Sequence, residues 1–441
     1  MSLPGYPQYK DSEIPWVGRI PTAWSVYPLL SLVSERTESN AGMRENNLLS
    51  LSYGRIVRKD IEANDGLLPE SFETYQIVEP GDIVLRLTDL QNDKRSLRSA
   101  LVEERGIITS AYLEICPSKV QPRFLAYLLR AYDLTKVYYS MGGGLRQSMK
   151  FTDMKRMPQV VPSDDEQSAI VAFLDHETGK VDALIGGQEE LLTLLAEKRR
   201  ATISRAVTRG LDPEAPMKDS GVEWLGKVPA HWRVSPLKYL ASLRSGGTPS
   251  KENLNFWDGD VPWASAKDLK VEQLGDTVEH ITNLAVESGN ASLLPAGTVL
   301  VVVRGMILAR TFPVVETLTP MAINQDLKGL APLEGLHSRF LAWLLRGSAD
   351  ESLLRLDEAG HGTKALRMDA WTSMRLPVPP IDEQSDIVRF LVSETAKLDN
   401  LKAEAERAIE LLKERRSALI AAAVTGRIDV RNAVELEELA A

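Results

Sequence analysis

The chain of 441 residues is 44% hydrophobic and 26% charged, and it contains one cysteine, Cys116. This length allows two to four domains, and the composition is that of a soluble globular protein. A single cysteine excludes a disulfide within the chain and a metal site built from several cysteines. No apolar run approaches the roughly 18 residues that a membrane-spanning helix needs, and the first residues lack the pattern of a signal peptide. We therefore expect a cytoplasmic protein.

The net charge of −9 argues mildly against a nucleic-acid partner, because the phosphate backbone attracts positive charge. The acidic excess is not spread evenly, however. It lies in residues 162–212 and 377–441, whereas the stretches 25–161 and 233–376 are close to neutral. Charge alone therefore does not exclude DNA binding by these two stretches.

The first of these stretches has the pattern of a mixed α/β globule. Residues 82–86 alternate as a short strand does, and residues 123–130 have the apolar spacing of an amphipathic helix. Residues 86–98 mix the side-chain types that pair with base edges and phosphates, although a solvated charged loop would have the same composition. A glycine-containing segment, 144–148, suits a backbone that lies close to phosphate. The candidate DNA contacts are Arg86, Lys94, Arg95, Arg98, Arg146, Gln147 and Ser148.

Residues 163–209 are predicted to form one long helix. Ser163 stands three residues before Glu166, as in a capping box, and the acids of the first turn suit the helix dipole. Gly186 and Gly187 lie in the middle, and each costs about 1 kcal/mol relative to alanine. We expect a kink or a break at this pair.

The sequence then repeats itself. The segment from Arg123 to Arg130 recurs from Arg339 to Arg346 with only Tyr127 replaced, by Trp343. The Asp-Glu-Gln motif of 165–167 recurs at 382–384, and the Trp-rich segment of 10–24 recurs at 218–232. The repeated unit is roughly 210 residues, far longer than a solenoid repeat. It predicts two similar bodies with pseudo-two-fold symmetry.

Between the repeated segments the two copies diverge, which suggests one task performed on two different targets. The second copy has a strand-like run at 298–303 and polar loops at 246–249, 263–268 and 303–305. A further glycine-containing segment, 362–366, corresponds to 144–148 of the first copy. Trp263 is more often a core residue than a contact. The candidate DNA contacts of this copy are Lys267, Arg304, Thr363 and Lys364.

Residues 379–426 form the second predicted helix, opened by Pro379-Pro380. Both helices carry apolar residues at heptad spacing, which predicts that they pair antiparallel as a coiled coil. At about 1.5 Å per residue the first helix spans roughly 69 Å, about 20 base pairs. A plain scaffold would show the same periodicity. The predicted seam is Leu174, Val181, Leu184, Leu191, Leu195, Leu391, Leu398, Leu401, Leu412 and Leu419.

Most catalytic signatures are absent from the sequence. It contains no phosphate-binding loop, no nucleophile elbow and no His pair at metal-ligand spacing, so we expect no catalytic residue and no bound metal. A DNA methyltransferase would carry an Asn/Asp-Pro-Pro-Tyr/Phe motif, but the only Pro-Pro pair lies between Val378 and Ile381. A coiled-coil scaffold would explain the helices but not two divergent inserts in repeated frames.

The whole layout resembles the specificity subunit of type I restriction–modification systems. The segments that carry this resemblance are Ile20-Pro21 to Trp24 and Val228-Pro229 to Trp232, together with the two Asp-Glu-Gln motifs that open the long helices. By this resemblance, residues 1–162 and 210–378 are target recognition domains, residues 163–209 and 379–426 are the helices, and 427–441 is a tail.

The resemblance also implies partners and cofactors. Each recognition domain would read half of an asymmetric bipartite DNA target, and the helices would set the spacer. Two modification subunits that carry S-adenosylmethionine would dock on this frame for adenine N6 methylation. Restriction subunits would add ATP- and Mg-dependent translocation and cleavage. This chain itself would hold no cofactor and would not be an enzyme.

Overall fold

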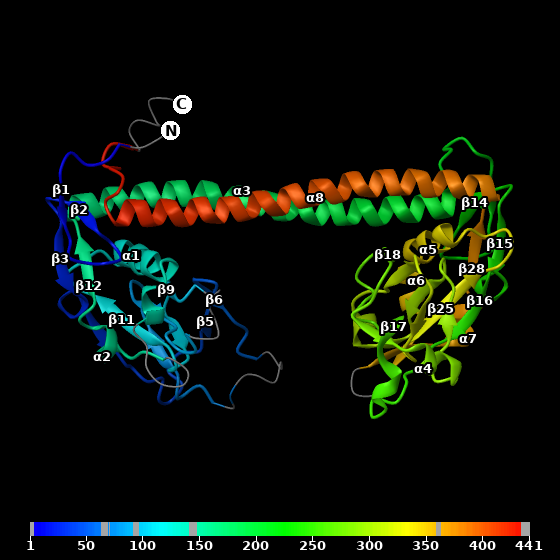
Figure 1. Cartoon of the computed structure of the whole chain (residues 1–441). Coiled ribbons are helices and arrows are strands. Elements are labelled where there is room, and N and C mark those ends of the chain that lie inside the picture. The colour runs from blue at the N-terminus through cyan, green and yellow to red at the C-terminus, as the bar shows by residue number, and fades with distance from the viewer. Residues whose placement is uncertain are drawn as a thin grey trace. The chain divides into compact units, whose positions relative to one another are not determined.

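The computed structural model describes residues 4–62, 69, 71–90, 97–140, 148–358 and 363–433 (Figure 1). In this part of the chain, no helix has the length and apolar character required to cross a membrane. The chain divides into two compact units. Unit 1 comprises Met1–Glu189 and Arg407–Ala441, and unit 2 comprises Glu190–Glu406. Each unit therefore combines one globular body with half of each long helix.

Unit 1 is built from short strands and two helices besides the long ones. In chain order these are β1 (Tyr9–Asp11), β2 (Arg19–Pro21), β3 (Ser25–Pro28), η1 (Leu29–Ser31), β4 (Val33–Arg36), β5 (Leu49–Ser52), β6 (Arg55–Arg58), β7 (Gln76–Val78), β8 (Ile83–Leu85), β9 (Ser99–Leu101), β10 (Gly106–Ile108), β11 (Leu113–Pro117), α1 (Pro122–Leu134), η2 (Val137–Ser140), α2 (Phe151–Met154) and β12 (Pro158–Val161).

The main sheet of unit 1 has the strand order β4-β11-β8-β9. The apolar face of α1 packs on it, so that Phe124 and Leu128 share one core with Ile83 and Ile115. The prediction of a mixed α/β body is confirmed. The amphipathic spacing of α1 and the short alternating strand were the sequence features that indicated it.

Unit 2 repeats this plan with more strands. They and its short helices are β13 (Met217–Asp219), β14 (Lys227–Pro229), β15 (Arg233–Pro236), η3 (Leu237–Tyr239), β16 (Ala241–Ser245), η4 (Leu254–Phe256), β17 (Trp257–Ala264), β18 (Gln273–Leu274), β19 (Glu279–Ile281), α4 (Asn283–Glu287), β20 (Leu293–Leu294), β21 (Val299–Val302), β22 (Arg304–Gly305), η5 (Met306–Ala309), β23 (Val314–Thr317), β24 (Met321–Ile323), β25 (Leu327–Pro332), α5 (Ser338–Gly347), α6 (Ala349–Leu353), β26 (Leu356–Glu358), β27 (Lys364–Leu366), α7 (Met368–Thr372) and β28 (Arg375–Val378).

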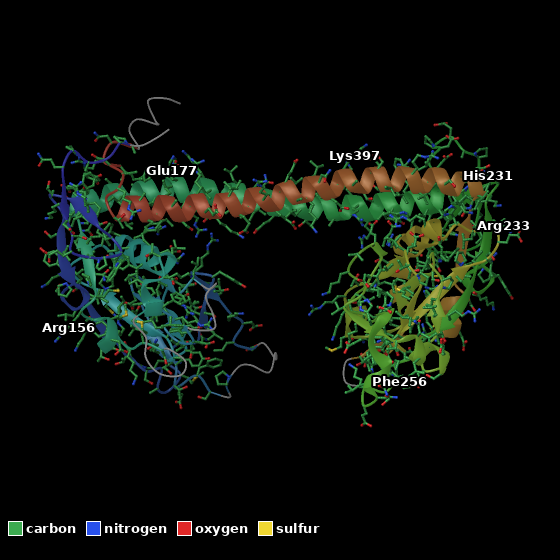
Figure 2. The ribbon with its side chains drawn as sticks, in the orientation of Figure 1. Arg156, Glu177, His231, Arg233, Phe256 and Lys397 are labelled. Carbon is green, nitrogen blue, oxygen red and sulfur yellow. The ribbon has the colours of Figure 1, made fainter. Side chains whose placement is uncertain are left out.

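The sheets of unit 2 that have three or more strands are β16-β25-β21-β23-β18, β19-β17-β24-β20 and β22-β27-β26. Helix α5 packs on the first of them, as α1 does in unit 1. His231 and Arg233, which belong to the repeated frame, lie at one end of unit 2, and Phe256 lies at the other end (Figure 2). The divergent insert therefore forms the part of the unit that is remote from the frame.

The repeated frame has the same construction in both units. In each unit, the strand that follows the Trp-rich segment pairs with the strand that precedes a long helix. In unit 1 Ser25 lies opposite Val161, and in unit 2 Arg233 lies opposite Val378. The tryptophans Trp24 and Trp232 are buried beside these pairs. The frame therefore brings the beginning and the end of each copy together.

The repeated Asp-Glu-Gln motif acts through its buried glutamine. Gln167 Oε1 accepts the backbone N–H of Gln121 at 2.8 Å, and Gln384 Oε1 accepts that of His337 at 2.8 Å. These acceptors serve the N-cap residues of α1 and α5. Each side-chain amide also donates to a proline carbonyl, that of Pro162 at 3.0 Å or Pro379 at 2.9 Å. One glutamine thus ties the start of each long helix to the start of a short one.

The repeated Arg-Phe-Leu-Ala segments end in half-buried arginines with a structural role. Arg130 donates to the carbonyl oxygens of Gly54 at 2.6 Å and Ser99 at 2.5 Å, and Arg346 donates to those of Glu272 at 2.7 Å and Val314 at 2.8 Å. Burial lowers the pKa of Arg130 and of Arg346 to about 10. Both stay charged at neutral pH and hold backbone carbonyls of the body in place.

The two long helices are α3 (Asp164–Arg209) and α8 (Ile381–Val424). In unit 1 the beginning of α3 packs beside the end of α8 (Figure 1), with Asp182 Oδ1 accepting from Arg416 Nη1 at 2.8 Å. In unit 2 the end of α3 packs beside the beginning of α8, with Arg199 Nε 3.3 Å from Asp399 Oδ1. The helices are therefore antiparallel within each unit.

The expected break at Gly186-Gly187 is wrong, because α3 runs through this pair without interruption. No atom lies within 4 Å of a Cβ built at either glycine. Packing therefore does not require glycine here, and the two residues only lower the intrinsic helix propensity.

The two rows of the predicted seam differ in burial. Leu174, Val181, Leu195, Leu391 and Leu398 are buried, and Leu412 and Leu419 are half-buried. The companion row is displaced by one residue, however. Leu184, Leu191 and Leu401 are exposed (55%, 39% and 47%), whereas Thr178, Thr395 and Ile409 are buried and Ile185 and Leu192 are half-buried. The buried companion row therefore follows the first row by four residues rather than three. The sequence pattern indicated the other spacing because threonines occupy part of the buried row, whereas exposed leucines lie at the three-residue spacing.

Replacing Gln167 or Gln384 with alanine should lower the free energy of unfolding. Each change removes the acceptor of a part-buried N–H and leaves a buried proline carbonyl without this donor, at about 1–3 kcal/mol for each unsatisfied group. Urea denaturation measures the loss. The exposed Gln8 is the control, and its replacement by alanine should change stability by less than about 0.5 kcal/mol. Equal stability of all three variants would contradict the role assigned to the buried glutamines.

Candidate nucleic-acid interface

Four of the predicted DNA contacts, Lys94, Arg95, Arg146 and Gln147, lie outside the described residues. Ser148, which directly follows two of them in the chain, is exposed. Arg86 is half-buried and directly follows β8. These positions stay predictions for unit 1.

Arg98 is a correction, since its side chain is completely buried (0% exposed). Its Nη1 donates to the carbonyl oxygens of Arg86 at 3.1 Å and Thr88 at 2.8 Å, and its Nε donates to Tyr139 Oη at 3.2 Å. A buried guanidinium that binds carbonyls shapes the backbone rather than contacting a ligand. Arg98 therefore positions the loop that begins at Arg86. The sequence pattern did not reveal this role, because a loop arginine and a buried one look alike.

Three candidates of unit 2 come together on the small sheet β22-β27-β26. Arg304 lies opposite Ala365, and Gly305 lies opposite Lys364, which follows Thr363 directly. Arg304 is exposed, and Thr363 and Lys364 are half-buried. Lys364 Nζ donates to Glu358 Oε1 at 2.6 Å. The exposed cation of this group is therefore Arg304, while Lys364 is held by an acid.

Three polar loops of unit 2 are tied to one segment, 323–326. The N–H of Gly247 donates to Ile323 O at 2.9 Å, that of Asn324 donates to Ala264 O at 3.0 Å, and that of Val303 donates to Asp326 O at 2.8 Å. At Gly246 a Cβ would lie 2.1 Å from the Asn324 carbonyl oxygen. Glycine is required there because the two backbones touch. The loops predicted separately from the sequence therefore converge.

The segment at the centre of this convergence was missed. Gln325 is exposed, and Thr248 Oγ1 donates a hydrogen bond to its Oε1. Asn324 is buried, and its Oδ1 accepts the N–H of Asp326 at 3.2 Å. Gln325 thus presents an oriented amide, the group that reads adenine in the major groove. An Asn-Gln-Asp triplet directly after the apolar strand β24 was the signal that could have found it.

Lys267 lies at an exposed turn after β17. Asp268 Oδ2 accepts the backbone N–H of Ser265 at 2.8 Å and its hydroxyl at 3.0 Å, which fixes the turn. Trp263 is buried, as expected, and its Nε1 donates to the carbonyl oxygen of Gly247 at 3.0 Å. The tryptophan therefore braces the glycine loop from inside.

Two other features could hold a ligand. A cleft of about 690 Å³ in unit 1 has four arginines and four carboxylates on its walls, so its charge favours neither anions nor cations. The charged residues are Arg55, Glu103, Glu104, Arg123, Arg130, Asp175, Asp182 and Arg416. The described residues also include one group with metal-ligand donor atoms close together, Asp82, Glu114 and Cys116.

Comparison with known proteins shows similarity to specificity subunits of type I restriction enzymes. Residues 229–411 match the family model described as the type I restriction modification DNA specificity domain. The specificity subunit of the type I restriction enzyme EcoR124I/EcoR124II from Escherichia coli is 26% identical over 62% of this chain. The match covers 64% of that relative, less than two thirds of its length.

Two further comparisons extend over more of the chain. The MjaVIII specificity subunit of Methanocaldococcus jannaschii is 21% identical over 81% of this chain and 81% of its own. A solved chain described for the complex assembly and conformational transition of a type I restriction–modification system has a TM-score of 0.69. It is 17% identical and covers 92% of this chain and 98% of its own, so the two share a fold. Residues 229–411 therefore match a type I restriction modification DNA specificity domain, and the chain is similar to specificity subunits of type I restriction enzymes.

Proposed function

We propose that each unit of this chain reads one half of an asymmetric, bipartite DNA target. One observation carries this proposal: two copies of the same frame hold inserts that differ in sequence and in sheet topology. A shared frame with different inserts suits one kind of ligand read in two ways. The chain acts by binding, and the chemistry belongs to its partners.

In unit 2 the reading surface consists of the loops around segment 323–326. Arg304 and Lys267 supply exposed cations, and Gln325 supplies an amide oriented by Thr248. These are the side-chain types that bind guanine, adenine and phosphate. In unit 1 we assign the corresponding role to Arg86, whose carbonyl oxygen Arg98 holds, and to the candidates Lys94 and Arg95, which follow it in the sequence.

The long helices set the distance between the two half-sites. They form an antiparallel coiled coil with pseudo-two-fold symmetry, as their heptad spacing and the equivalent pairs Asp182–Arg416 and Arg199–Asp399 support. The 46 residues of α3 correspond to roughly 69 Å, or about 20 base pairs.

The outward leucines of the helices support a docking surface for partner proteins. Leu184, Leu191 and Leu401 lie on the solvent side although leucine normally is buried. We assign this surface to two modification subunits, which would carry S-adenosylmethionine. Restriction subunits would join the complex and bring ATP and Mg.

A genome-wide map of N6-methyladenine in cells that express this chain with its modification partner tests the proposal. We expect a bipartite motif in which exchange of residues 210–378 changes one half only. The map from cells with the partner alone is the control. A stable complex that produces no motif would instead favour a protein scaffold.

Removal of the Arg304 side chain should weaken binding of the target duplex. The loss of one good base contact costs about 1–3 kcal/mol, which is roughly tenfold in affinity, and it should concern one half-site only. Fluorescence anisotropy with the purified complex at fixed salt measures the change for Arg304→Ala. Lys227→Ala is the matched control, because Lys227 is exposed on the frame strand β14. An equal loss in both variants would mean that only general charge attraction was measured.

A further inference from the structure

A buried polar cluster lies on the main sheet of unit 1, between β4, β8 and β11. Glu114 and Cys116 are two residues apart on β11 and therefore point to the same face. Glu114 lies opposite Arg36 of β4, and Asp82 directly precedes Ile83, which lies opposite Ile115. One carboxylate oxygen of each acid and the Cys116 sulfur all lie within 4.8 Å of one another.

The contacts within the cluster leave Glu114 unsatisfied. Cys116 Sγ lies 2.8 Å from Asp82 Oδ1, and Arg36 Nε lies 3.1 Å from the same sulfur. Arg36 approaches Asp82 Oδ2 to 3.5 Å and Glu114 Oε1 only to 3.7 Å. Glu114 is 1% exposed, and neither of its carboxylate oxygens accepts a hydrogen bond from the residues that the structure describes. A buried carboxylate without a donor is costly and calls for a further ligand.

The second copy shows that the fold does not need this cluster. The strand pair β4–β11 of unit 1 corresponds to the pair β16–β25 of unit 2, with Val33 opposite Pro117 in the first and Ala241 opposite Pro332 in the second. In this alignment Gly329 takes the position of Glu114, and Ala331 takes that of Cys116. Thr298, which directly precedes β21, corresponds to Asp82. A Cβ at Gly329 would lie 2.6 Å from Leu294 Cδ1, so side-chain carbon fills that space in unit 2. The ligand set is therefore particular to unit 1.

We propose that Asp82, Glu114 and Cys116 bind a divalent transition-metal cation of the zinc class. One thiolate and two carboxylates are donors that zinc accepts, whereas calcium and magnesium bind through oxygen alone. Three anionic ligands and the Arg36 cation leave two negative charges, which a divalent cation neutralises. Arg36 would then donate a hydrogen bond to the metal-bound sulfur without binding the metal itself. Burial raises the pKa of Glu114 to about 9 and that of Cys116 to about 11, so binding at neutral pH releases the proton of each group to solvent.

The cation would link the start of β8 to β11. Strand β8 leads directly to Arg86 and the loop that Arg98 positions. The site therefore stabilises the strand from which the candidate reading loop of unit 1 departs. This proposal is independent of the DNA target, because it concerns the isolated chain.

Cobalt titration of the purified full-length chain tests the site. Cys116 is the only cysteine, so a thiolate-to-cobalt charge-transfer band can arise only from this position. We expect the band to appear, to disappear on addition of zinc, and to be absent from Cys116→Ser. Glu114→Gln and Asp82→Asn should each weaken cobalt binding at least tenfold. Asp212→Asn, a change of an exposed carboxylate outside the cluster, should leave the affinity unchanged.

A second measurement needs no variant and avoids any loss of folding. Zinc should slow alkylation of Cys116 in the native chain at least tenfold, and a chelator should restore the rate. Absence of the cobalt band at millimolar cobalt would overturn the proposal, as would unchanged cobalt affinity in a folded Glu114→Gln variant. Alkylation at the same rate with and without zinc would also overturn it.

Discussion

Burial of the apolar stripe of each long helix is the constraint on which the rest of the structure depends. An isolated helix of this length leaves its row of leucines in water, at a cost of about 25 cal/mol for each Å² of apolar surface. Within each unit the other long helix covers this row, and Leu174, Val181, Leu391 and Leu398 become buried. The chain supplies both helices because its sequence is duplicated. The antiparallel direction then follows, since each unit contains the beginning of one helix and the end of the other.

Besides apolar contacts, the globular bodies are attached to these helices by polar side chains that both copies share. Gln167 and Gln384 join the first turn of each long helix to the N-cap of α1 or α5. Arg130 and Arg346 extend from those short helices to backbone carbonyls of the body. The inserts can therefore differ while the frame stays the same. In unit 2 three polar loops of the insert are hydrogen-bonded to segment 323–326.

The parts of the fold that repeat in the sequence were predictable, and the parts that depend on long-range packing were not. The duplication, both long helices and the mixed α/β bodies follow from local periodicity and self-similarity. The second row of the seam was misplaced, since Thr178 and Thr395 are buried there while outward leucines such as Leu184 imitate the row. The burial of Arg98 depends on Tyr139 and on carbonyls of a neighbouring loop. The meeting of Asp82 with Glu114 and Cys116 depends on strand pairing, which no local pattern reveals.

The central claim is that the bodies read DNA and the helices set the distance between the half-sites. Deletion of one heptad from each helix, residues 186–192 and 406–412, tests it most directly. Both deletions lie between the pairs Asp182–Arg416 and Arg199–Asp399, so both contacts are retained. The deletion shortens the helix pair by about 10 Å, or about three base pairs. Methylation mapping should then show the two original half-sites with a shorter gap between them. Methylation at the original spacing, or at altered half-sites, would contradict the account.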